Sequence, residues 1–193
     1  YDIIDGLPPG TEINSQGQLS NFFNITQSPG GALGGEVDQF MGSMLLQMTG
    51  TGALTGFNRN VNMPISFGEM HHGPRVPGTH LQSFPSDLFG LQGQIIGDPD
   101  FDLLRITAGT GFGMPSPGHT TLSQLPGGQW NVDSFFDITY RIDFVGSPGG
   151  PLAGWSGSTT GTMSGVTGLI FLFTGPSLYA GCMVASLSGR RTM

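Results

Sequence analysis

The sequence predicts an all-β protein: an antiparallel β-sandwich or jelly-roll-like domain of roughly eight to ten short strands, with extended N- and C-terminal arms. Three observations lead to this class. Residues 136–144 alternate strictly between apolar and polar side chains, Gly (34 residues) and Pro (14 residues) supply many turns, and no stretch has the period of a helix of two turns or more. Because Gly weakens regular elements, we expect each strand to be short and bounded by turns.

The segment 129–145, QWNVDSFFDITYRIDFV, is the longest in the chain without Gly or Pro. Its even positions from 136 onward are apolar: Phe136, Ile138, Tyr140, Ile142 and Phe144. The intervening odd positions carry Asp, Thr and Arg, and a helix would divide the apolar residues between two faces. The alternation therefore predicts a strand with one face in the core and the other in water, as in an antiparallel sheet.

The chain before this strand begins with residues 1–17, whose Pro-Pro pair and weak periodicity predict an extended arm with a short strand at Ile3 and Ile4. Alternation and turn signals then predict strands at 18–28, 44–49, 58–67, 79–84, 88–96 and 101–108. Pro85-Ser86-Asp87 is predicted to be a turn and 109–128 a long loop.

Two more strands are expected after the central one, at 155–163 and 166–173, and the second is apolar on both faces. We therefore divide the chain into an arm (1–17), one β-sandwich domain (18–179) and a C-terminal tail (180–193). A chain of 193 residues is long enough for one sizeable core.

Charged residues make up only 10% of the chain, against about 25% in ordinary soluble domains. The net charge is −7 and all cations are Arg, so no basic patch is available for nucleic acid or for acidic membranes. No apolar run reaches the ~20 residues of a membrane span. The single cysteine, Cys182, rules out an internal disulfide framework and is expected to be a buried apolar residue.

The best candidates for a metal site are Glu69, His71, His72 and His80, because imidazoles and a carboxylate in a Gly/Pro-rich loop can hold zinc or copper. Their spacing matches no established ligand motif, and adjacent histidines point in opposite directions along an extended chain. We therefore predict no metal and no cofactor, and keep these four residues as the candidates to check. His119 is the only other imidazole.

The acidic residues give no catalytic signature. Asp98, Asp100 and Asp102 alternate as calcium ligands do, but the Gly and Glu that an EF-hand loop requires are missing, so an Asp-Pro turn is expected. Asp137 and Asp143 alternate outward on one strand, which predicts a solvated face rather than a glycosidase pair. No catalytic residue is predicted, and we expect that the protein is not an enzyme.

Residues 133–138, DSFFDI, with GPSLY at 175–179, resemble a pattern in secreted bacterial proteins of unknown function, several of which carry C-terminal sorting tails. The resemblance covers about residues 44–179. It implies an extracellular, β-rich domain and supplies no catalytic residues. The terminal apolar stretch with Arg190-Arg191 is similar to such a tail but lacks its Pro-Glu-Pro signature.

The leading hypothesis for function is a secreted structural protein that self-assembles into an extracellular filament, sheath or bacterial surface layer. Low charge and the lack of a catalytic constellation favour it, and copies would join by strand exchange or edge pairing. One alternative is a carbohydrate-binding module that sets Trp130, Trp155 or Tyr179 against sugar rings. The other alternative is a metal-dependent enzyme that uses the loop with His71, His72 and His80. Asn24 fits a glycosylation acceptor, but a strand at this position argues against modification.

Overall fold

The computed structural model describes residues 1–128, 130–171 and 185–187. Within these ranges the chain forms ten β-strands in one antiparallel sheet, two short 3-10 helices and no α-helix. The predicted all-β, antiparallel class is confirmed. None of the described helices has the length and apolar character needed to cross a membrane.

Six of the strands are 15 to 18 residues long, far longer than the short elements that the sequence predicted. The strands are β1 (Asp2–Ile3), β2 (Ile13–Gly30), β3 (Gly35–Gly50), β4 (Asn58–His72), β5 (Leu81–Ile96), β6 (Phe101–Ala108), β7 (Pro117–Gln124), β8 (Trp130–Gly146), β9 (Ser156–Phe171) and β10 (Ala185–Leu187). The 3-10 helices are η1 (Gly52–Leu54) and η2 (Thr110–Phe112).

Glycines lie inside these long strands because aromatic rings of neighbouring strands cover them. Phe40 lies directly opposite Gly68, and a Cβ at Gly68 would be 2.2 Å from the Phe40 ring. Phe136 covers Gly118 in the same way, at 2.3 Å. The expectation that frequent Gly would keep the strands short was therefore wrong, because here Gly makes room for a ring that stabilises the pairing.

Two local predictions were also wrong. The expected turn Pro85-Ser86-Asp87 lies in the middle of β5, where the Pro85 carbonyl accepts a hydrogen bond from the backbone N–H of Gly73 (2.8 Å). The expected loop 109–128 contains β7, whose Thr120 and Leu122 face the core. A proline inside β5 and a single large apolar residue, Leu122, inside β7 gave too weak a strand pattern to recognise.

The strands follow one another as a meander from β2 to β5, after which the order divides. The far edge of β5 pairs with β7 along residues 81–87 and with β6 along residues 91–96. β8 pairs with the same two strands, so that β5, β6, β8 and β7 close a four-stranded antiparallel ring, and β9 adds to the outer edge of β8. The two separate packed sheets of a sandwich are not distinguished in this arrangement.

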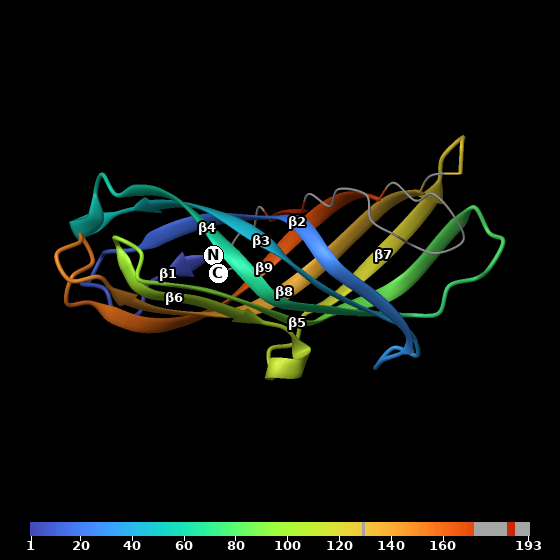
Figure 1. The fold of residues 1–193 in the computed structure, drawn as a ribbon, viewed down its shortest axis with the longest axis horizontal. Helices are drawn as coiled ribbons and strands as arrows, with labels where there is room; N and C mark the ends of the chain where they lie inside the picture. The colour runs from blue at the N-terminus through green and yellow to red at the C-terminus, as the bar shows by residue number, and fades with distance from the viewer. Residues whose placement is uncertain (129, 172–184, 188–193) are drawn as a thin grey trace.

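The N-terminal segment packs on the chain's own sheet. β1 pairs with the start of β2, and the backbone N–H groups of Ile4 and Asp5 donate to the Thr159 hydroxyl on β9 at 3.0 and 2.9 Å. Tyr1 and Ile3 are buried in the core. β1 therefore bridges β2 and β9, and the sheet curls around a common interior (Figure 1). β2 itself starts within the segment expected to be an arm.

The core lies on the inner face of the curled sheet. β8 buries the same alternate positions that the sequence predicted, from Phe136 to Phe144. The molecule is elongated, with strands oblique to its long axis (Figure 1). We call the end with the β5–β6 turn and the β8–β9 loop the apolar end. The opposite end, with the β2–β3 turn and the β4–β5 loop, is the polar end.

Candidate functional site

A row of polar side chains crosses the inner face of the sheet at the polar end. Strand register places Glu36 on β3 opposite His72 on β4, and His72 opposite Ser86 on β5. Directly paired residues project to the same side of a sheet. The row continues with Thr120 on β7 and Ser134 on β8, both of them buried.

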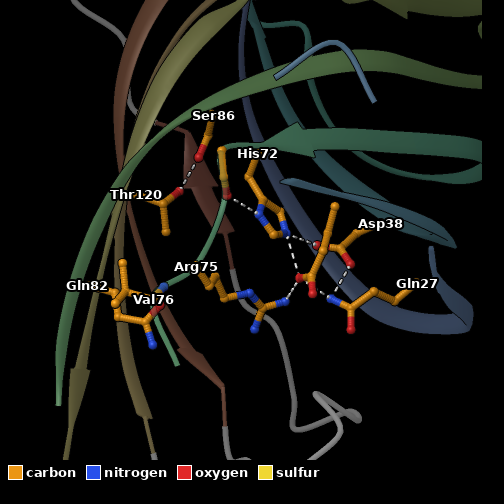
Figure 2. Close-up of polar contacts among 10 residues, drawn as sticks. Gln27, Asp38, His72, Arg75, Val76, Gln82, Ser86 and Thr120 are labelled. Atoms are coloured by element: carbon orange, nitrogen blue, oxygen red, sulfur yellow. Dashed lines mark hydrogen bonds and ion pairs between the residues drawn. The ribbon is translucent and has the colours of Figure 1, made fainter. Parts of the chain in front are cut away.

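His72 is the centre of this row. Its side chain is only 7% exposed, and its ring lies against Phe84 with a centroid separation of 5.1 Å. Nδ1 is 3.1 Å from the Gly73 carbonyl oxygen, which can only accept, so Nδ1 carries the hydrogen. Nε2 faces two carboxylates, at 3.4 Å from Glu36 Oε2 and 3.3 Å from Asp38 Oδ2 (Figure 2).

The two carboxylates are also held by groups from outside β4. Arg75, in the β4–β5 loop, forms an ion pair with Glu36. The Gln27 amide on β2 donates to Glu36 Oε2 at 3.0 Å and to Asp38 Oδ1 at 2.9 Å (Figure 2). A cation entering between the carboxylates would have to displace these donors. Gln27, Glu36, Asp38, His72 and Arg75 form one polar cluster. This cluster connects the β2–β3 hairpin to β4 and to the loop that follows β4.

A chain of buried hydroxyls continues from the cluster along the row. Ser86 Oγ donates to Thr120 Oγ1 at 2.7 Å, and Thr120 Oγ1 is 2.9 Å from Ser134 Oγ. Although the register sets Ser86 opposite His72, the Ser86 hydroxyl is directed at Thr120 and the His72 nitrogens face the Gly73 carbonyl and the carboxylates. The Ser86 hydroxyl therefore donates to Thr120 and not to the imidazole, to which the hydroxyl of an activated serine would donate.

His71 and Glu69 lie on the outer face, so the two adjacent histidines point to opposite sides of β4. The Ala32 backbone N–H donates to His71 Nδ1 at 3.1 Å, which leaves the hydrogen on Nε2 to be donated to Glu69 Oε1 at 2.8 Å. The His71 ring stacks on Phe89, with 4.2 Å between centroids. Both of its nitrogens are therefore engaged, and the ring is buried.

His80 is separate from both histidines: it is exposed and its Nδ1 contacts the Gln124 side chain. The four candidates Glu69, His71, His72 and His80 thus divide between the inner face, the outer face and the far end of the β4–β5 loop. Across residues 1–128, 130–171 and 185–187, no group of three or more metal-ligating side chains is arranged around a common point.

The other sequence candidates have structural roles. Asp98 accepts the backbone N–H of Asp100 at 3.0 Å, and Arg59 pairs with Asp98 at 2.7 Å and with Asp100 at 2.9 Å, so GDPD is a turn fixed by an arginine. Trp130 and Trp155 are partly buried against the core. Tyr179, Cys182 and Arg190-Arg191 lie outside the described residues.

Among the side chains that the structure describes, two groups of exposed apolar residues lie on the outer face, one at each end of the molecule. The turn patch, at the apolar end, consists of Ile96, Leu103 and Val145, which lie side by side on β5, β6 and β8. Ile96 is 71% exposed and Val145 38%. The whole patch lies at the end that Figure 1 shows with the β5–β6 turn.

The loop patch lies at the polar end and consists of Leu81 at the start of β5 and Leu125 just after β7, which are 65% and 40% exposed. A hydrogen bond from the Gln124 backbone N–H to the His80 carbonyl (2.8 Å) keeps the start of β5 beside the end of β7. This bond brings Leu125 close to Leu81.

Sequence reasoning selected His72 from its residue type but missed its partners Glu36, Asp38 and Arg75. One usable signal was present: Glu36 and Asp38 share the alternation of Phe40 and therefore face the core side of β3. Comparison of the chain with protein-family models, with curated proteins and with solved structures finds no match.

Proposed function

We propose that the protein is an extracellular structural protein whose copies associate end to end into a filament. The observation that carries the proposal is the pair of exposed apolar patches at opposite ends of an elongated molecule. The two patches differ in sequence and in the elements that carry them, so a contact between them is head to tail. A head-to-tail contact that does not close into a ring continues as an open fibre.

The composition of the surface supports this proposal. Ile96 and Leu81 are more than 60% exposed, and contact with a second copy would remove both from water. Only 10% of the residues are charged, so few ions have to be desolvated when two copies meet. The similarity of DSFFDI at 133–138 to secreted bacterial proteins supports an extracellular location.

The contact that we propose uses side chains rather than an exchanged strand. β1 already pairs with β2 of its own chain, and β2 pairs on its other edge with β3. Tyr1 and Ile3 would have to leave the core before the first segment could join another copy. A docked pair of apolar patches needs no such rearrangement.

Two single substitutions test the proposal. We expect the unmodified protein to form fibres visible by negative-stain electron microscopy at high concentration. Ile96→Lys and Leu81→Lys each place a charge in one patch and should leave monomers by light scattering. Thr160→Lys, an exposed outward position on β9 away from both patches, is the matched control and should still polymerise.

Mixing the two variants sharpens the test. Ile96→Lys keeps an intact loop patch and Leu81→Lys keeps an intact turn patch, so the mixture should form dimers and stop there. A chain that stays monomeric without substitutions, or variants that polymerise as well as the control, would contradict the proposal.

A further inference from the structure

We propose that the outer face at the polar end binds a neutral polysaccharide, along a row of three exposed rings. The ring row consists of Pro85 on β5, His119 on β7 and Phe135 on β8. Strand register sets Pro85 opposite His119 and His119 opposite Phe135, so the three side chains project to the same side of three neighbouring strands. All three are exposed, and Phe135 is 41% exposed.

The ring row is regularly spaced and partly fixed in position. Neighbouring strands lie about 4.8 Å apart, so the rings follow one another at that spacing across the sheet. His119 Nε2 is 2.6 Å from the Ser83 hydroxyl, which holds the imidazole on the outer surface beside Pro85. A ligand therefore meets a surface that is ordered before it binds, and this lowers the entropic cost of binding.

Hydrogen-bonding side chains flank the ring row. Ser83, Thr121 and Asp133 form the next outward row on the same three strands, in direct register with one another. Asp87 and Asp137 lie on the other side of the rings, two positions from Pro85 and Phe135 along their strands. Apolar rings bordered on both sides by hydroxyls and carboxylates match a pyranose, which has CH groups on its faces and hydroxyls around its rim.

Charge disfavours anionic ligands. The ring row and its flanks contain Asp87, Asp133 and Asp137 and no arginine, so nucleic acid, anionic lipid and acidic glycans are repelled. Phe135 is the one large exposed hydrophobic residue among these positions, which is too little apolar surface for the centre of a protein–protein interface. A neutral polysaccharide chain laid across the strands carries no negative charge and needs only a small apolar contact surface.

Retention on insoluble polysaccharides tests the proposal directly. The full chain is incubated with washed microcrystalline cellulose, chitin or starch granules, and the protein left in the supernatant is measured. We expect retention on at least one of the three, weakened about ten-fold by Phe135→Ala. Phe23→Ala is the matched control, because Phe23 is 49% exposed on β2, outside the ring row, and its loss should not change retention.

The outcomes separate this proposal from end-to-end assembly. Leu81→Lys, which is expected to be monomeric, should be retained as well as the unmodified chain, while Phe135→Ala should still form fibres. Circular dichroism checks that Phe135→Ala is folded, and Asp133→Asn provides a second variant that should also weaken retention. The proposal is overturned if the unmodified chain stays in the supernatant with all three polymers, or if Phe23→Ala weakens retention as much as Phe135→Ala.

Discussion

The inner face of the sheet differs between the two ends of the molecule in the side chains that it buries. At the apolar end the inner face carries side chains such as Phe101, Leu104 and Phe144, which are at most 1% exposed. At the polar end the same face carries Glu36, His72 and a chain of buried hydroxyls. Burial of apolar surface therefore stabilises the apolar end, whereas hydrogen bonds fix the arrangement of side chains at the polar end.

Ion pairs occur at both ends. At the apolar end Asp143 on β8 is 3.0 Å from Arg105 and 2.7 Å from Arg141 on the outer face, and Arg59 pairs with Asp98 and Asp100 at the β5–β6 turn. At the polar end, Glu36 is paired with Arg75 on the inner face, beside His72. The carboxylates of Asp143 and Glu36 are 13% and 33% exposed, so neither ion pair is fully buried and each is expected to contribute modestly to stability.

The largest expected effect is the loss of an aromatic ring at the apolar end. Phe144→Ala should lower the free energy of unfolding by about 3–5 kcal/mol, because a fully enclosed ring leaves a cavity. Phe136→Ala on the same strand is the matched change toward the polar end and should cost less. Urea unfolding of both variants measures the difference, and equal losses would show that the two ends share one core.

Removal of the central imidazole should have an intermediate effect. His72→Ala leaves the Gly73 carbonyl and the two facing carboxylates without this partner, and should lower the free energy of unfolding by about 1–3 kcal/mol. His80→Ala is the control, since an exposed histidine should cost under about 0.5 kcal/mol. If thermal unfolding shows the same small change for both, the inner cluster does not hold the polar end together.

The smallest effect concerns acid stability at the apolar end. Partial burial raises the pKa of Asp143, but hydrogen bonds from Ser158, Arg141 and Arg105 outweigh it and leave the pKa below its ordinary value. The ionised carboxylate therefore stabilises the fold above the pKa of the unfolded chain, about 3.9, and this contribution is lost as the pH falls through the lowered value. Asp143→Asn should slightly flatten the decline in melting temperature below pH 4. An unchanged decline would show that Asp143 does not contribute to the loss of stability in acid.

The sequence was sufficient for some parts of the structure and not for others. The alternation from Phe136 to Phe144 predicted β8 and its buried face, because a period of two reports burial directly. Strand length was underestimated, since a glycine covered by a ring from the next strand looks like any other glycine in the sequence. Phe40 and Gly68 are paired only by the register of β3 with β4.

The polar cluster could not be predicted for a related reason. Glu36 and His72 are far apart in the chain, and only the pairing of β3 with β4 brings them together. Arg75 reaches Glu36 from a loop, where no periodicity indicates direction. The ring row has the same origin, because Pro85, His119 and Phe135 come from three different strands.

The bridge that β1 makes between β2 and β9 has a consequence for the order of events during synthesis. The hydrogen bond from Ile4 to Thr159 joins residues 155 positions apart, so most of the chain must be synthesised before the N-terminal segment can bind to β9. Until then the N-terminal segment lacks its contacts with β9, and closing so long a loop slows folding. A chain synthesised only as far as β8 therefore leaves this segment without its Thr159 partner.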